Sequence, residues 1–467
     1  MSGLYSTLGA SVSALDAQSI AIDVAGKNLA NVNNPNYARQ SVIFGDRGTV
    51  VTADGAQSLG LEALGVQQMR DALLDKQVVR ETSVTAGLTA QQEAYQRTQT
   101  SLGQTINSTG STSSPTSSST GLNAALSKFF GSFQTLAANP TDTGVRQTLL
   151  QNAASLADQL QQTDARLAQV QSDLTDSATA DVQTANATLT QIANLNTQID
   201  RAEIGHPGSA VDLRDLRQAA LESLAKQLPI DTVSTASGTI QVVMKDAANA
   251  TVVLVDDTKV QGTVALSGGS VTAGSPATTV VGNGGTIMGA LTARDGAIQN
   301  LRSNLDALAQ QLVASVNGAY NPAGTTGKDF FNPSGGSAGT IAVSSSLTAG
   351  NLVAGTGGAG DNTTALAVAA VATRQFSVAG GDAIDGTIGQ FYSSTTSGFG
   401  SALATVSSNV TDQTNIETMV RSQRDSVSGV NLDEEMANLV KFQRAYQASS
   451  RVFSLVDDLL DTVVNKL

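Results

Sequence analysis

The C-terminal segment limits most strongly what this chain can fold into. From residue 439 to residue 467, apolar side chains recur at alternating spacings of three and four, and only Ser449 interrupts them. This spacing predicts one apolar helix face in the manner of a coiled-coil seam. Such a helix is not stable alone in water, so it needs a partner. The expected seam consists of Leu439, Phe442, Tyr446, Phe453, Val456, Leu460, Val463 and Leu467.

The N-terminal segment has the same character. Leu8, Leu15, Ile22 and Leu29 recur every seven residues, which predicts a second apolar helical stripe, about 40 Å long at about 1.5 Å per residue. The helix is expected to stop in residues 31–35, where a proline restricts the residue before it. Taken alone, such stripes indicate a homodimeric coiled coil or an intramolecular core. Two terminal helices that each need a partner most simply pack on each other.

Between the ends the periodicity changes from helix to strand and back. Helical periodicity covers residues 63–106, 122–203, 211–228, 298–320, 385–428 and 431–466. Shorter alternating runs predict strands at residues 239–244, 251–255 and 260–266. Residues 107–120 are a Ser/Thr/Gly-rich linker by composition, and residues 321–362 are rich in Gly and Ser with short strand-like pieces.

Composition excludes several classes of function. The 467 residues carry a net charge of −13 with no basic cluster, which argues against nucleic-acid binding. There is no cysteine and only one histidine, His206, so thiolate zinc sites and the usual activated nucleophiles are missing. No phosphate-cradling loop is present. We therefore expect no enzyme activity, no catalytic residues, no cofactor and no metal. The absence of a long apolar run predicts no membrane insertion.

Several motifs resemble those of the flagellar rod, hook and hook-associated axial proteins. The amino-terminal pattern Asn-Leu-Ala-Asn-Val-Asn at 28–33 matches the family signature, and Tyr37 followed by Arg39 and Gln40 is similar to its hook-associated members. Residues 429–439 and 441–448 resemble the closing motif of the family. Residues 211–215, 284–295, 316–317 and 327–331 match it internally.

The resemblance implies a structural subunit of the bacterial flagellum that assembles at the hook–filament junction and is required for filament assembly. A hook or distal-rod subunit is the alternative. The implied partners are further copies of the chain in a ring-like layer, the hook protein, a second junction protein on the filament side, and an export chaperone on the C-terminal helix. The implied location is extracellular, in the flagellum, after type III export without a cleaved signal peptide.

We expect a mainly α fold with inserted β structure (α+β), elongated and multi-domain. Paired terminal coiled-coil helices (1–40 and 431–467) form an inner domain. A helical-bundle shaft (41–231 with 284–320 and 385–430) carries a β-rich outer insertion (232–283 and 321–384). Besides the two stripes, the assembly interface is expected to include Asn28, Asn31, Asn33, Tyr37, Arg39 and Gln40. For residues 28–40 the plainer interpretation is a simple helix stop.

Overall fold

The chain folds into two compact units built mainly of helices. The computed structural model describes residues 2–52, 55–102, 121–235, 238–358 and 360–465. The first unit comprises residues 1–86, 181–285 and 412–467, and the second comprises residues 87–180 and 286–411. The long helices α2 (Ala72–Ser101), α4 (Thr143–Ala202) and α9 (Ile388–Ser428) contribute residues to both. The expected mainly α fold with inserted β structure is confirmed.

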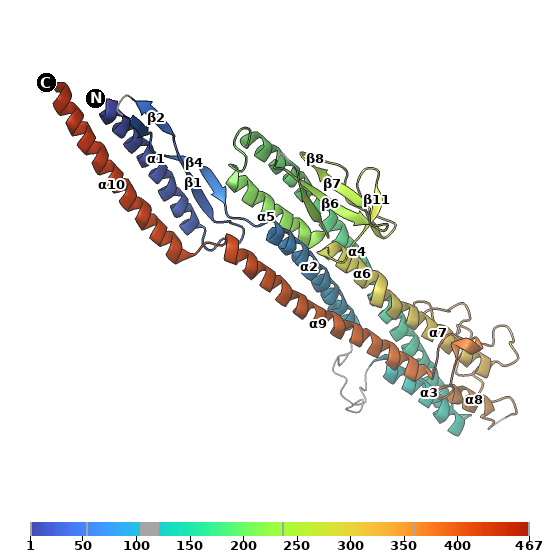
Figure 1. The fold of residues 1–467 in the computed structure, drawn as a ribbon. Coiled ribbons are helices and arrows are strands. Elements are labelled where there is room, and N and C mark those ends of the chain that lie inside the picture. Colours follow the sequence, from blue (N-terminus) through green and yellow to red (C-terminus); the bar gives the residue numbers. More distant parts are fainter. Residues whose placement is uncertain (1, 53–54, 103–120, 236–237, 359, 466–467) are drawn as a thin grey trace. The chain divides into compact units, whose positions relative to one another are not determined.

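The two ends of the chain pair within the first unit. Helix α1 (Ser2–Ala30) lies beside α10 (Leu432–Asn465), as Figure 1 shows. The innermost face of α1 is made of small residues: Ala17, Ala21 and Ala25 are at most 2% exposed. Small side chains let a neighbouring element approach the helix backbone closely.

Two antiparallel strand pairs pack beside α1. Strand β1 (Gln40–Asp46) pairs with β4 (Leu61–Gln68), and β2 (Thr49–Thr52) pairs with β3 (Gly55–Ser58). We expected helix from residue 63 and no strands here, and that prediction is wrong. Gly60 has a φ of +93°, and a Cβ there would lie 2.9 Å from the Cα of Ala10. Glycine therefore lets this ribbon meet α1, a tertiary contact that local periodicity does not reveal.

The β insertion of the first unit follows α5 (Val211–Gln227). Its strands form one antiparallel sheet in which β6 pairs with β5, β7 and β11. The sheet contains β5 (Asp231–Ser234), β6 (Ile240–Asp246), β7 (Thr251–Asp256), β8 (Lys259–Val260), β9 (Ala265–Ser267), β10 (Ser270–Ala273) and β11 (Thr278–Val281). Asn186 and Asn196 of α4 hydrogen-bond to sheet backbone atoms, which ties the insertion to the helices. The strands expected at 239–244 and 251–255 are present with small shifts, whereas the one expected at 260–266 is divided into the end of β8 and the start of β9.

The second unit is a helical bundle around an aromatic core. Its further helices are α3 (Leu122–Ala138), α6 (Gly285–Ala293), the π-helical turn η1 (Arg294–Ile298), α7 (Gln299–Tyr320), α8 (Thr363–Val371) and the 3₁₀ turn η2 (Val378–Gly380). Phe129, Phe133, Phe330 and Phe331 are fully buried against one another. The described residues between 321 and 362, where we expected strand-like pieces, contain only the isolated bridge of Phe331 with Val343.

Candidate functional site

Asn28, the first residue of the amino-terminal motif, joins the two terminal helices. Its side chain is 1% exposed and uses all four of its hydrogen-bonding positions. Its Oδ1 accepts hydrogen bonds from the Tyr37 hydroxyl (2.8 Å) and the Gln40 backbone N–H (3.0 Å). Its Nδ2 donates to the Gln40 carbonyl and to Oε2 of Glu435 in α10, both at 2.9 Å. A buried amide whose donors and acceptors are all hydrogen-bonded fixes the positions of the groups around it.

Arg39 adds two charged contacts between the same elements. Its guanidinium lies 2.8 Å from Oε1 of Glu435 and 3.0 Å from Oε2 of Glu434. Its backbone N–H donates to the Ser428 carbonyl at the end of α9 (2.8 Å). Glu435 is only 3% exposed, so water hardly reaches its carboxylate. Arg39 balances this buried charge. We call Asn28, Tyr37, Arg39, Gln40 and Glu435 the terminal junction.

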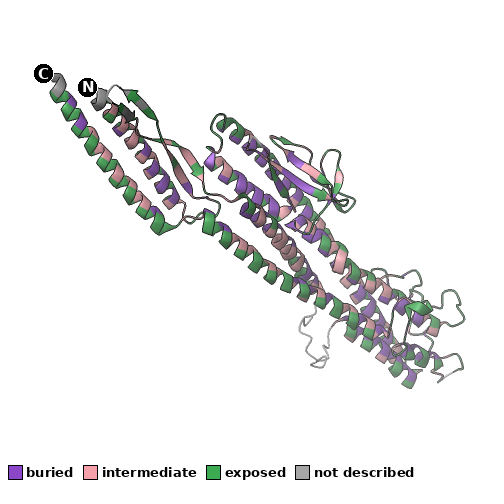
Figure 2. Cartoon of the chain, in the orientation of Figure 1, coloured by how far each residue is buried: buried purple, intermediate pink, exposed green. Residues whose placement is uncertain are grey.

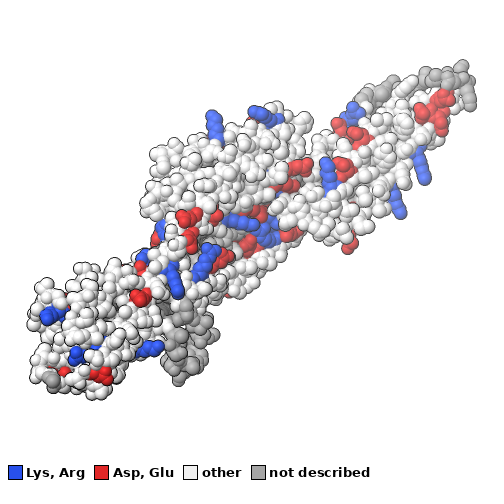
Figure 3. Space-filling view, turned by 180° about the vertical axis from the view of Figure 1, so that it is seen from behind, with Lys and Arg blue, Asp and Glu red and all other residues white. Residues whose placement is uncertain are grey.

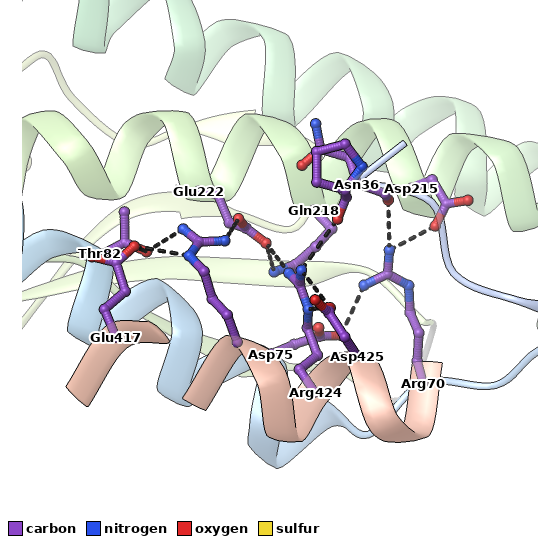
Figure 4. A network of polar contacts seen from close by, with 12 residues as sticks. Asn36, Arg70, Asp75, Thr82, Asp215, Gln218, Glu222, Glu417, Arg424 and Asp425 are labelled. Atoms are coloured by element: carbon purple, nitrogen blue, oxygen red, sulfur yellow. Dashed lines mark hydrogen bonds and ion pairs between the residues drawn. The ribbon is translucent and has the colours of Figure 1, made fainter. Parts of the chain in front are cut away.

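The turn that follows α1 is held by arginine side chains that also form ion pairs with neighbouring acidic residues (Figure 4). Arg424 donates to the Pro35 carbonyl (3.2 Å), and Arg70 donates to the Asn36 carbonyl (3.3 Å). Arg424 also pairs with Glu222 of α5 at 2.9 Å, and both side chains are under 10% exposed. Glu222 in turn binds Arg421 at 3.0 Å. The turn is therefore clamped between α5, α9 and the loop before α2.

The environment of the terminal junction favours the protonated, neutral form of Tyr37. Burial raises the pKa of Tyr37 well above its usual range, and the nearby carboxylates of Asp215, Asp212 and Glu435 raise it further. The phenol thus stays protonated and can donate its hydrogen bond to Asn28 at any physiological pH. Gln40 extends the junction to α5, because its Nε2 donates to Oδ1 of Asp212 at 3.0 Å.

The predicted interface residues fall into distinct environments within the first unit. In α10, Val456 and Leu460 are buried, while Tyr446 is 40% exposed. The half-buried residues are Leu8, Leu15, Ile22, Leu29, Asn31, Leu439, Phe442 and Phe453. Asn33 is exposed. Leu467 lies outside the described residues, as does the side chain of Val463.

Sequence reasoning did not find the role of Glu435. The sequence places Glu435 only within the closing motif at 429–439, where Asn431 caps α10 by accepting the N–H of Asp433 at 3.0 Å. Glu435 lies 407 positions from Asn28. Nothing local in one sequence indicates that pairing.

Beside the terminal junction lies an open polar groove of about 650 Å³. It is lined by the turn 31–35 and by the connection between α9 and α10, with Arg39 and Glu434 at its wall.

The described residues show neither a metal-binding group nor a membrane-spanning helix. Among the described residues no group of three or more His, Cys, Asp or Glu side chains is arranged to hold a metal ion. No helix in the described ranges is long and apolar enough to cross a membrane. Figure 3 shows acidic and basic side chains interspersed on the face drawn, without a continuous basic patch.

Comparison with known proteins places three parts of the chain. Residues 112–331 match the flagellar hook-associated protein FlgK helical domain. Residues 8–37 match the model described as flagella basal body rod protein, and residues 421–467 match the flagellar basal body rod FlgEFG protein C-terminal model. The two terminal matches cover α1 from residue 8 onward and all of α10, with Asn28, Tyr37 and Glu435 of the terminal junction.

Relatives match over the whole length. Flagellar hook-associated protein 1 of Bacillus subtilis is 27% identical over 97% of this chain and 96% of its own length. The protein of that name from Salmonella typhimurium is 24% identical over 99% and 100%. A solved structure, the flagellar hook junction protein FlgK from Burkholderia pseudomallei, aligns with a TM-score of 0.46 at 21% identity, covering 55% of this chain and 46% of that one.

The paired terminal helices and these matches define an axial structural protein of the bacterial flagellum. Within that class, the longest match is to the helical domain of the hook-associated protein, so the hook-associated interpretation is favoured over a hook or distal-rod subunit. The chain belongs to the flagellar hook-associated protein 1 family.

Proposed function

We propose that this chain forms the layer of subunits that joins the hook to the filament, and that it has no catalytic activity. The observation that carries this proposal is the state of the terminal helices. They are joined to each other by the terminal junction, yet a second apolar face remains uncovered along α10.

The uncovered face lies away from the seam. Val452, Leu455 and Leu459 are 46%, 61% and 46% exposed, whereas Val456 and Leu460 next to them are buried. Figure 2 shows this exposed side of α10. Val12 of α1 is also 50% exposed. Contiguous apolar surface on a folded subunit is typical of a protein–protein interface.

The occupants of this face are the neighbouring subunits of a ring-like layer. In the proposed layer the seam and turn residues position the terminal pair, and the exposed face of α10 makes the contacts between subunits. The hook protein and a second junction protein on the filament side would meet the layer above and below. Before assembly, an export chaperone would shield the same C-terminal helix.

The proposed location is outside the cell, at the distal end of the hook. In this proposal the chain reaches that location through the flagellar type III channel.

The direct test is a clean deletion of the gene followed by electron microscopy. We expect hooks without filaments and flagellin shed into the medium, both restored by the wild-type gene. Loss of the hooks themselves would assign the chain to the hook or rod instead. Normal flagella would contradict the proposal.

A further inference from the structure

A second pocket, of about 350 Å³, lies in the first unit between α2, α5 and strand β5. Four cationic side chains line it: Arg70, Lys76, Arg214 and Arg217. Thr232 and Ser234 of β5 bring hydroxyl groups to the same lining. None of the five residues of the terminal junction lines this pocket.

Arg217 is the unusual member of this set. It is only 4% exposed, and no carboxylate of the described residues forms an ion pair with it. Its Nη1 donates to neutral acceptors, Oδ1 of Asn196 at 2.9 Å and the Gly238 carbonyl at 3.1 Å. A buried guanidinium without a counter-charge is costly, because the groups around it replace water only in part.

The carboxylates nearby are already committed to other arginines. Glu203 pairs with Arg214 through two contacts of 2.7 Å. Asp75 and Asp215 pair with Arg70, at 2.9 and 2.6 Å.

Burial, together with the positive charges of Arg214 and Arg70, lowers the pKa of Arg217 to about 10 against the raising effect of Glu203. Counting Lys76, the four cations exceed the three carboxylates of Glu203, Asp75 and Asp215 by one, and Asp75 itself lines the pocket. The buried Nε of Arg70 also makes no hydrogen bond within the described protein.

We propose that this pocket binds a small tetrahedral oxyanion of the phosphate or sulfate type. Guanidinium groups match the geometry of such anions through paired N–H donors, and the hydroxyls of Thr232 and Ser234 supply further donors. The anion neutralises Arg217 and links β5 of the insertion to α5 and α2. It thereby stiffens the attachment of the β insertion.

The test measures anion binding to the purified full chain. Inorganic phosphate and sulfate are titrated by calorimetry at constant ionic strength, with acetate as a planar anion and chloride as the balancing salt. Four proteins are compared: wild type, Arg217→Gln, Lys76→Gln and, as a matched loss of charge outside the pocket, Lys259→Gln, whose side chain is exposed on β8. Thermal denaturation with each anion is recorded in parallel.

We expect phosphate and sulfate to bind the wild type and raise its melting temperature, with acetate much weaker. Arg217→Gln should weaken binding by at least about tenfold, because it removes a charged hydrogen-bond donor to the anion. Lys76→Gln, at a half-buried position that tolerates change, should weaken it less, so the test survives if Arg217→Gln fails to fold. Lys259→Gln should bind as the wild type does. No binding by the wild type, equal binding by all four proteins, or acetate binding as tightly as phosphate would each overturn the proposal.

Discussion

Asn28 in the first helix and Glu435 in the last are joined by a hydrogen bond of 2.9 Å, although 407 positions separate them in the chain. Each also serves other partners: Asn28 binds Tyr37 and both backbone groups of Gln40, and Glu435 binds Arg39. The conspicuous asparagine of the amino-terminal motif thus has a structural role, since it closes α1 onto α10.

Removing the Asn28 amide should loosen this closure. Asn28→Ala leaves the Gln40 backbone groups and one Glu435 oxygen without their partner, which should cost about 1–3 kcal/mol. Urea denaturation, and amide exchange in α10, measure the effect. Asn33→Ala, at an exposed position in the same motif, is the control and should change the free energy of unfolding by less than about 0.5 kcal/mol. Equal stability of both variants would argue against the terminal junction.

Glu222 should be the most sensitive acid of the network around the turn. Glu222→Ala removes the buried charge partner of Arg424, which keeps only the exposed Asp425, and one partner of Arg421, which should destabilise the fold by about 3–5 kcal/mol. The control is Glu93→Ala, which breaks the exposed pair with Arg97 and should cost less than about 0.5 kcal/mol. Thermal and urea melts of the two variants give the comparison. A small effect at Glu222 would mean that water replaces the lost partner.

Gly289 should not tolerate a methyl group. A Cβ there would lie within van der Waals overlap of the Gly87 carbonyl oxygen, at 2.1 Å. Gly289→Ala should therefore cost about 1–3 kcal/mol through forced backbone shifts. Gly318→Ala in α7 meets nothing within 4 Å and should instead stabilise by about 0.5–1 kcal/mol. If both substitutions stabilise, the close contact between α2 and α6 is not maintained in solution.

An aspartate introduced on the exposed side of α10 should affect assembly, whereas one introduced on its buried side should affect folding. Leu459→Asp, on the exposed face, should leave folding intact and prevent filament assembly. Leu460→Asp buries an unpaired carboxylate against α1 and should destabilise the terminal pair by several kcal/mol, roughly the cost of an uncompensated buried polar group. Circular dichroism and complementation of the deletion strain separate these outcomes.

Ser454→Asp adds the same charge at an exposed polar position and is the control for Leu459→Asp. Normal filaments with Leu459→Asp would remove this face from the proposed interface.

Glu203 should make stability depend on pH on the acid side. Burial alone would raise its pKa, but hydrogen bonds from Arg214 and from the backbone of Gly208 and Ala210 outweigh burial and lower it. The folded state therefore binds this proton less readily than the unfolded state. The stabilisation is present above the ordinary carboxyl pKa and is lost as the pH falls through the folded value. Denaturation curves from neutral pH downward should show a shallower decline for Glu203→Gln. Parallel curves for the two proteins would contradict the role of this pair.

The sequence predicted the terminal helices well, because their apolar periodicity is strong and long. It did not indicate which residues of α1 lie innermost. The large residues Leu15 and Ile22 are half-buried, while Ala17 and Ala21 form the innermost contact. Hydrophobicity favours large side chains, but close helix packing favours small ones.

Long-range pairings were beyond local reasoning. Asn317 was noted only as part of a motif, yet its amide both donates to and accepts from the backbone of Phe331, at 2.9 and 2.8 Å. The strands at residues 40–68 were missed for the same reason, since their stability comes from packing on α1.

The pairing of the two ends also sets when the fold can be completed. A ribosome makes the chain from its N-terminus, so α1 stays without its partner until the codons for α10 have been read. Closing a loop of this length costs conformational entropy before any contact repays it, and contacts of high sequence separation form late. Until α10 has been made, the side of α1 that faces it stays uncovered, and Asn28 lacks one of its four hydrogen bonds.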